Sequence, residues 1–167
     1  MKLLIGLFAL ASGPAAAGVH PPEVEARLAA IVGDWTLAGQ EATFRERCDW
    51  YHDRAFVVCA SEDRSDKSYS QSVIGYSAAE GHYTYHHFDS SGASNSRIGH
   101  PHGELGLVYT AERRTRKGLV RMTTWLAPKP DGRVHFREER SLAGGPWTEA
   151  ADFHYVRRAG AAARKIR

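Results

Sequence analysis

Aromatic side chains are the residues of this chain that are best suited to contact a small ligand. They recur at alternate positions in segments where successive residues point to opposite faces. Two charged residues accompany them and are candidates for polar anchors, because a mainly apolar pocket needs only a few polar groups to orient its ligand. The predicted ligand-contact residues are Trp50, Tyr83, Tyr85, Tyr109, Arg121, Phe136 and Glu139.

A purely structural interpretation of the same residues stays open. Large aromatic side chains often do no more than fill a core. Arg121 and Glu139 would then form an ion pair between two neighbouring strands, since opposite charges commonly face each other across a sheet.

Glu46 is the one carboxylate for which the alternation allows an interior position, because it shares a face with Phe44, Cys48 and Trp50. Burial would raise its pKa, and such an acid could transfer protons, as in small barrel isomerases and cyclases. The interpretation that we favour places Glu46 at the mouth of the fold, exposed to water, since buried unpaired acids are rare. The chain has no Gly-x-Ser-x-Gly, P-loop, His-Glu-x-x-His or dinucleotide-binding motif, and no catalytic residue is predicted.

Histidine is frequent, with nine residues, and is a common metal ligand. His86 and His87 are adjacent and point to opposite faces of a strand, which argues against a shared site. His100 and His102 lie on a turn, where they could bind a metal ion with a third ligand. Because no second cluster is defined, no metal and no cofactor are predicted.

A short helix and a series of strands must position these side chains. Val24, Leu28 and Ile31 recur at helical spacing, and Gly33 supplies the stop. After Gly33 the apolar period changes to two, which is typical of strands. Ten strand-like segments follow, each bounded by turn residues: 34–38, 43–51, 55–60, 69–76, 82–89, 93–99, 104–112, 119–127, 133–141 and 147–158.

The short connections between these segments predict an all-β fold. Strands that follow each other without an intervening helix pair with their chain neighbours. Closure into a barrel removes the exposed edges that so many strands would otherwise present. The sequence therefore predicts a closed antiparallel up-and-down barrel of 8–10 strands behind a short N-terminal helix, with a β-sandwich as the alternative.

The two cysteines are predicted to form a disulfide. Cys48 and Cys59 are symmetric about a turn near Asp53 and Arg54, so a two-residue loop would place them opposite each other. In that register their Cα atoms would lie about 5.5 Å apart. The disulfide would stabilise the chain by about 3 kcal/mol. Free thiols or a thiol metal site are disfavoured, because the short Cys-x-x-Cys spacing is missing.

The N-terminus has the pattern of an export signal. Lys2 is followed by the apolar run 3–11 and by small residues at 15–17, so residues 1–17 are predicted to be a cleaved signal peptide. The barrel domain would span 18–158 and a basic disordered tail 159–167. These features predict a periplasmic or secreted protein, monomeric or a weak homodimer, without a membrane span. The formal charge of +3 is too small to indicate a nucleic-acid partner.

The beginning of the first strand resembles the lipocalins. Gly33, Asp34 and Trp35 match a Gly-x-Trp motif that follows a short helix. In that superfamily an arginine of the last strand packs over the tryptophan, and Arg157 stands at the matching position. The resemblance thus implies that Trp35 plugs one end of the barrel, next to Gly33, and that Arg157 covers it.

A longer resemblance covers most of the predicted mature chain. Its motifs occur in a familiar order: Cys48-Asp49-Trp50, Phe56-Val57-Val58-Cys59, Ile74-Gly75-Tyr76, Tyr83-Thr84-Tyr85, Ser90-Ser91-Gly92, Tyr109-Thr110, Arg121-Met122-Thr123, Phe136 with Glu139 and Ser141, and Gly145-Pro146-Trp147. Together they resemble a bacterial family of small secreted lipocalin-like (calycin-type) barrels, domain of unknown function 1579. The resemblance implies the barrel but no established activity. One departure is the stretch 141–145, which replaces an expected Ser-x-Asp-Gly turn.

Haem binding is a further alternative, because nitrobindin-type proteins are ten-stranded barrels with a histidine ligand near the C-terminus. His154 is the candidate here. Its position alternates with Tyr155 and Arg157, so we expect it to face outward if Arg157 covers the plug. This argues against a haem ligand.

The function predicted from the sequence is binding or carrying of a small hydrophobic or amphipathic molecule by an exported barrel. A small barrel enzyme that uses an interior carboxylate is the first alternative, and a haem-binding or metal-binding barrel is the second.

Overall fold

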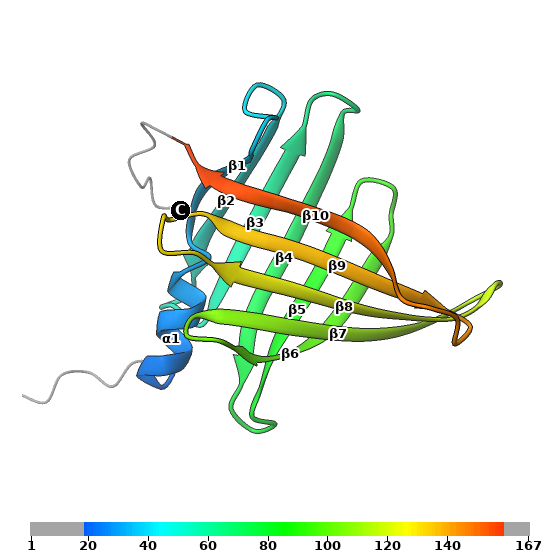
Figure 1. Cartoon of the computed structure of the whole chain (residues 1–167). Coiled ribbons are helices and arrows are strands. Elements are labelled where there is room, and N and C mark those ends of the chain that lie inside the picture. Colours follow the sequence, from blue (N-terminus) through cyan, green and yellow to red (C-terminus); the bar gives the residue numbers. More distant parts are fainter. Residues whose placement is uncertain (1–18, 159–167) are drawn as a thin grey trace, which may run out of the picture.

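The computed structural model describes residues 19–158, which form a barrel of ten strands with one short helix at its end (Figure 1). The predicted signal peptide and the predicted basic tail lie outside the described residues. In chain order the elements are α1 (Pro22–Ala29), β1 (Gly33–Leu37), β2 (Phe44–Tyr51), β3 (Phe56–Asp63), β4 (Ser68–Ser77), β5 (His82–Asp89), β6 (Ser94–His102), β7 (Gly106–Thr115), β8 (Gly118–Pro128), β9 (Val134–Leu142) and β10 (Thr148–Arg157).

Every strand pairs antiparallel with its neighbours in the chain, and β1 pairs with β10 to close the sheet. Trp35 stands opposite Arg157 in this closing ladder, and Leu37 stands opposite Tyr155. The predicted closed up-and-down barrel is therefore confirmed, with ten strands, and the sandwich is excluded. Within residues 19–158, no helix is both long enough and apolar enough to cross a membrane.

Helix α1 covers the end of the barrel at which β1 begins. Val24 and Leu28 are buried against the core. Arg27 ties the helix to the loop between β6 and β7, because its Nη1 donates hydrogen bonds to the carbonyl oxygens of Gly103 (3.1 Å) and Gly106 (2.8 Å). One end of the interior is thereby sealed.

Trp35 and Arg157 complete this seal. The indole of Trp35 is 3% exposed, and its Nε1 donates to the carbonyl oxygen of Ile31 at 2.8 Å. The guanidinium carbon of Arg157 lies 4.3 Å from the centre of the indole, a cation–π geometry, and Nη1 donates to the carbonyl oxygen of Val32 at 3.2 Å. A Cβ atom at Gly33 would lie 2.5 Å from Arg157 Nη1, so glycine leaves the room that the guanidinium needs.

The predicted disulfide between Cys48 and Cys59 joins β2 to β3 and is confirmed. The loop of the hairpin is longer than predicted, since β2 ends at Tyr51 and β3 begins at Phe56. The Cα atoms of the two cysteines are 3.9 Å apart. This separation is nearer to the roughly 4.5 Å of a non-hydrogen-bonded pair than to the 5.5 Å expected from a two-residue loop, because a loop two residues longer exchanges the two kinds of pair along the ladder.

Replacing Trp35 with alanine should destabilise the barrel strongly, because it removes a buried aromatic ring and leaves Arg157 without the surface it covers. The expected loss is about 3–5 kcal/mol in the free energy of unfolding, measured by urea denaturation. Trp147→Ala is the matched control, since the Trp147 side chain is 48% exposed and should cost less than about 1 kcal/mol. Equal losses in the two variants would contradict a sealing role for Trp35.

Candidate functional site

Two hollows lie inside the barrel. The inner cavity has a volume of about 40 Å³, enough for about three water molecules. The larger one, the mouth hollow, has about 470 Å³ and opens at the end opposite α1, where β3 meets β4 and β5 ends. The inner cavity is lined by Ile31, Trp35, Glu46, Cys59, Ser72, Ile74, Tyr85, Arg97, Tyr109, Thr124, Leu126, Val134, Phe136 and Tyr155. Tyr155 lines both hollows, so its side chain stands between them.

Glu46 of β2 lines the inner cavity, so the exposed position at the mouth that the sequence analysis favours is wrong. The Glu46 residue is partly buried, and it lines the wall of the cavity. Burial raises the pKa of the carboxyl to about 7, although a hydrogen bond from the Tyr155 hydroxyl counteracts part of the rise. At neutral pH this carboxyl is thus divided between its acid and its carboxylate forms.

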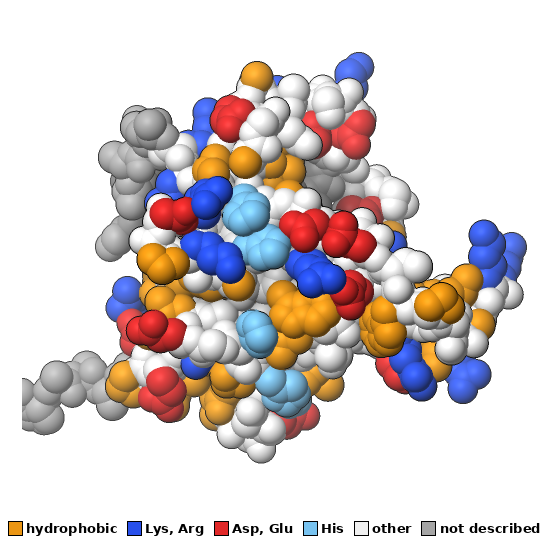
Figure 2. All heavy atoms as spheres, in the orientation of Figure 1, with side chains coloured by type: hydrophobic (Ala, Val, Ile, Leu, Met, Phe, Trp, Pro, Cys, Tyr) orange, Lys and Arg blue, Asp and Glu red, His pale blue; other side chains and the backbone are white. Residues whose placement is uncertain are grey.

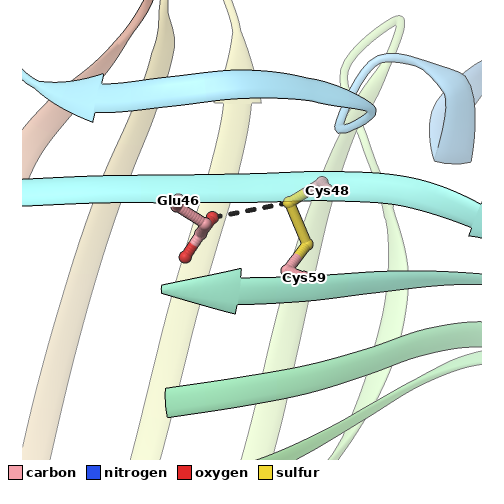
Figure 3. Close-up of side chains that lie close together, drawn as sticks. All are labelled: Glu46, Cys48 and Cys59. Atoms are coloured by element: carbon pink, nitrogen blue, oxygen red, sulfur yellow. Dashed lines mark hydrogen bonds between the residues drawn. A yellow bond between two sulfur atoms is a disulfide. The ribbon is translucent and has the colours of Figure 1, made fainter. Parts of the chain in front are cut away.

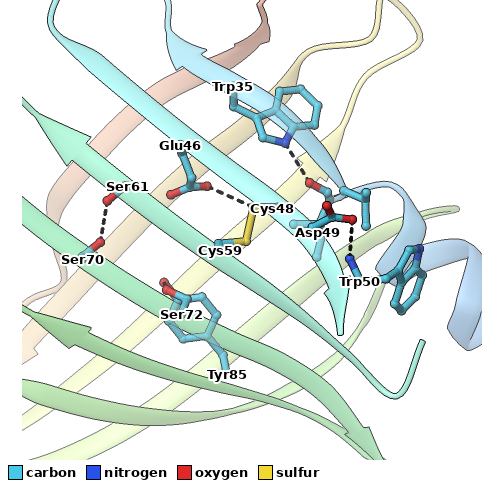
Figure 4. The surroundings of a disulfide bond; sticks show 12 residues. Trp35, Glu46, Cys48, Asp49, Trp50, Cys59, Ser61, Ser70, Ser72 and Tyr85 are labelled. Carbon is cyan, nitrogen blue, oxygen red and sulfur yellow. Dashed lines mark hydrogen bonds between the residues drawn. A yellow bond between two sulfur atoms is a disulfide. The ribbon is translucent and has the colours of Figure 1, made fainter. Parts of the chain in front are cut away.

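The Cys48–Cys59 disulfide forms the wall beside Glu46 (Figures 3 and 4). Glu46 Oε1 lies 3.5 Å from Cys48 Sγ. A disulfide sulfur carries no hydrogen, so this contact is a hydrogen bond only when the protonated carboxyl is the donor. Among the described residues these three side chains also place their ligand atoms within 4.8 Å of one another. They do not make a metal site in this state, because a metal needs free thiolates.

A second interior carboxylate, Glu138 of β9, has its cationic partner in place. Arg97 Nη1 lies 2.7 Å from Glu138 Oε2, and Arg140 Nη2 lies 2.7 Å from Oε1. Thr124 donates to Glu138 Oε2 at 3.0 Å, and Arg97 also contacts the Thr124 hydroxyl. Burial raises the pKa of Glu138, but the two arginines outweigh it and hold that pKa below its ordinary value. Glu138 is therefore ionised and fully paired.

Ser72, Tyr85 and His87 form a chain of hydrogen-bonding groups from the inner cavity toward the mouth hollow. The Ser72 hydroxyl lies 3.0 Å from the Tyr85 hydroxyl and 3.1 Å from His87 Nδ1. The Arg97 guanidinium carbon lies 5.2 Å from the centre of the Tyr85 ring. Burial raises the pKa of Tyr85, and burial together with Arg97 lowers the pKa of His87, so both groups are neutral at neutral pH.

The Tyr109 hydroxyl is the one buried side-chain polar atom without a hydrogen-bond partner among residues 19–158. The side chain is 1% exposed and lines the inner cavity. Gly99 on β6 leaves room for its ring, since a Cβ there would lie 2.4 Å from Cε1 of Tyr109. Buried hydroxyls nearly always have a partner, so the unpaired Tyr109 hydroxyl is an exception that calls for an explanation.

The predicted ligand-contact residues fall into three groups. Tyr85, Tyr109 and Phe136 line the inner cavity. Tyr83 is buried at 2% exposure, and Trp50 packs against the core beneath Arg54, but neither lines the two hollows described above. The last group is Arg121 and Glu139.

Arg121 and Glu139 lie on the outer face, so the prediction that they act as anchors inside the barrel is wrong. They alternate with the inward-facing Met122 and Glu138 along their strands. Arg121 pairs with Glu112 at 2.9 Å, and Glu139 contacts Arg137. The alternative ion pair between Arg121 and Glu139 is therefore not formed either.

The histidines of the last strands also lie outside. His135 and His154 stack on the outer face with ring centres 4.6 Å apart, and His135 Nε2 lies 2.9 Å from Asp152 Oδ1. In Figure 2 histidine and charged side chains gather over β8–β10. His154 has the outward position that its alternation with Tyr155 predicts, and it does not line the inner cavity, where a haem ligand would be needed.

The predicted set omits three polar residues of the interior: Ser72, Arg97 and Glu138. Alternation along the strands could have identified two of them as inward-facing. Arg97 is two residues from Gly99, and Glu138 is two residues from Phe136, so each pair shares a face of its strand. An inward-facing charge is unexpected where the core is assumed to be apolar. The ion pair between Arg97 and Glu138 becomes evident only when the arrangement of β6, β8 and β9 is known.

Comparison with known proteins does not assign the chain to a family. No family model matches the chain, and a search of curated proteins finds no significant match.

The raised pKa of Glu46 makes a prediction about stability. The folded chain holds the proton more tightly than the unfolded chain does, so stability should fall as pH rises from about 4.5 to about 7 and then level off. The loss from this group is about 3 kcal/mol, most of it between pH 5 and pH 8. Urea unfolding at these two pH values measures it.

Glu46→Gln is the control, because its amide cannot ionise. The variant should lack this part of the decline and should be more stable than the natural chain at pH 8. An identical pH dependence in the two proteins would show that Glu46 has an ordinary pKa.

Proposed function

We propose that the barrel binds a small amphipathic molecule in a site that combines the inner cavity with the mouth hollow. The wall of the cavity is mainly aromatic and aliphatic, and a few polar groups converge on it. This is the composition typical of small-molecule sites, in which apolar surface provides affinity and polar groups fix orientation.

The observation that carries the proposal is the Tyr109 hydroxyl. A tyrosine placed only to fill the core would bring a hydroxyl whose burial without a partner costs about 1–3 kcal/mol, and phenylalanine would avoid that cost. Tyr109 lines the cavity together with Glu46 and Arg97, and its hydroxyl has no partner among residues 19–158. A ligand with a hydrogen-bonding group at its inner end would satisfy it.

The size of the site follows from the place of Tyr155. The inner cavity alone holds only a few non-hydrogen atoms, whereas the mouth hollow of about 470 Å³ is of the size of small-molecule pockets. Rotation of the Tyr155 ring would join the two. The ligand would then place one end among Tyr85, Tyr109 and Glu46 and leave the other at the mouth.

We infer further that this binding takes place outside the cytoplasm. The Cys48–Cys59 disulfide supports this location, because disulfides persist in oxidising compartments. The signal-peptide pattern of residues 1–17 supports it as well. Membership of the secreted lipocalin-like family stays a proposal, supported by the closed barrel and by Arg157 over Trp35.

Filling the inner cavity should abolish ligand binding. The neutral fluorescent probe N-phenyl-1-naphthylamine should brighten on entering the barrel, and Tyr85→Trp should weaken its binding by about tenfold or more, because the larger ring occupies the cavity. Phe88→Trp is the matched control on the same strand, since Phe88 is 51% exposed on the outer face and should leave the affinity unchanged. A probe that does not bind the natural chain, or binds all three proteins equally, would contradict the proposal.

A second function, proton transfer, is favoured by the presence of an acid and a tyrosine with an unpartnered hydroxyl in the lining of one cavity. Glu46 has the pKa of a general base that works near neutral pH. The Tyr109 hydroxyl could stabilise the oxyanion of an enolate formed from a carbonyl compound. The test is exchange of the α-protons of small ketones in D₂O, followed by NMR. Exchange that depends on Glu46 would be lost in Glu46→Gln, whereas no exchange above the buffer rate excludes this function.

A further inference from the structure

We infer that the ligand carries a positively charged nitrogen and that Glu46 is the carboxylate that binds it. This inference rests on the proposed function and names the chemical class of the molecule: an amine with an apolar body. It is drawn from three features of the interior, namely the lack of a cation at Glu46, the contacts that already hold Arg97, and the charge of the mouth.

Glu46 has no cationic partner among the described residues. No salt bridge of residues 19–158 reaches it, and its neighbours are the Tyr155 hydroxyl and the disulfide. The contrast with Glu138 is informative, because that carboxylate has Arg97 and Arg140 within 2.7 Å. A carboxylate inside a protein is normally paired. Of the two acids in this barrel, one is paired by the chain and the other faces the cavity.

The other titratable groups around the cavity do not supply that charge. Arg97 also lines the cavity, but its guanidinium is already held by the chain, 2.7 Å from Glu138 and 5.2 Å from the centre of the Tyr85 ring. Tyr85, Tyr109 and Tyr155 all have raised pKa values because of burial and stay neutral. The remaining lining residues, Ile31 and residues of β1, β3, β4, β8 and β9, do not ionise. Glu46 is therefore the one carboxylate among the residues that line the inner cavity, and no cation of the described residues pairs with it.

The charged residues that line the mouth hollow are negative, as is the Glu46 carboxylate. Asp63 and Asp89 line it, and no lysine or arginine does. Hydrogen bonds from Ser91 hold the pKa of Asp89 below its ordinary value, so this carboxylate is ionised at neutral pH. His87 lines the hollow too, but its lowered pKa leaves it neutral. A cation approaching the barrel is attracted at this end and an anion is repelled.

Aromatic rings complete the surroundings of such a cation. Phe44, Phe153 and Tyr155 line the mouth hollow, and their ring centres lie 5.3–6.2 Å from one another where they touch. Carboxylates among aromatic faces are the usual environment of bound ammonium groups. A fatty acid would instead bring its carboxylate next to Asp89, Asp63 and Glu46. The interior thus favours an amine over a carboxylic acid with the same carbon chain.

Binding of the ammonium group is coupled to a proton. Below about pH 7 Glu46 holds its proton, which must leave when the ion pair forms. The balance is Glu46–COOH plus R–NH₃⁺ giving the pair Glu46–COO⁻ with R–NH₃⁺, and one H⁺ released to the buffer. Affinity for the amine should therefore rise with pH up to about 7 and then stay level while the amine is charged.

The test is a competition at pH 8 between three ligands with the same chain, octylamine, octanol and octanoate, each displacing N-phenyl-1-naphthylamine. Octylamine should bind about tenfold or more tightly than octanol, because hydrogen bonds to a charged group contribute about 1.5–3 kcal/mol. Octanoate should bind most weakly. Glu46→Gln should reduce the ratio of amine to alcohol affinity to about one. Glu112→Gln on the outer face is the matched control and should keep the ratio.

Calorimetry at pH 6 in buffers of different ionisation enthalpy provides an independent readout. Close to one proton should be released for each octylamine bound to the natural chain, and none from Glu46 in Glu46→Gln.

The possible failures can be told apart. Equal affinity for octylamine and octanol, or an amine preference that survives in Glu46→Gln, overturns the assignment of a cationic ligand and leaves the proposed binding function standing. If neither the probe nor any octyl compound binds, the binding function itself is refuted.

Discussion

The pairing of β1 with β10 is the constraint on which the other features of this barrel depend. It turns a sheet with two exposed edges into a closed wall and so creates an interior. The ladder is short, and side chains reinforce it where Arg157 lies over Trp35. Trp35 in turn bonds the segment that connects α1 to β1. Closure of the wall and closure of one end are therefore achieved by the same few residues.

Closure also decides the chemistry of the interior. A wall without gaps removes water from the side chains that point inward, and the effect on each acid depends on its neighbours. Glu138 meets two arginines and keeps a low pKa, whereas Glu46 meets a hydroxyl and a disulfide and has a raised one. The same barrel thus holds one acid for structure and another that is free to respond to a ligand. In the proposed function, the mouth hollow with its aspartates and aromatic rings would be the route by which a ligand reaches Glu46.

Most of the fold could be predicted from the sequence because alternation and turn residues are local signals. The strand order, the helix at the end of the barrel and the disulfide all follow from such patterns, whereas alternation only allowed the inward position of Glu46. The polar residues of the interior are harder to predict. Arg97 and Glu138 are adjacent only because β6, β8 and β9 curve around a common interior, and no local pattern encodes the curvature. The prediction that Arg121 and Glu139 point inward rests on their charge, which suits a polar anchor. Their alternation with Met122 and Glu138 instead indicates the outer face, where the structure has them. The predicted length of the loop in the cysteine hairpin is wrong because symmetry about a turn does not determine how many residues the loop contains.

The central physical claim is that closure of the barrel encloses Glu46 without a cation. The most direct measurement is a ¹³C NMR titration of the glutamate side-chain carboxyls, with Glu46→Gln used to assign the signal of Glu46. A midpoint near pH 7 for that signal, well above those of the exposed glutamates, is the expected result. A midpoint near 4.5 would contradict the claim, because it would place the carboxylate in water or beside a positive charge.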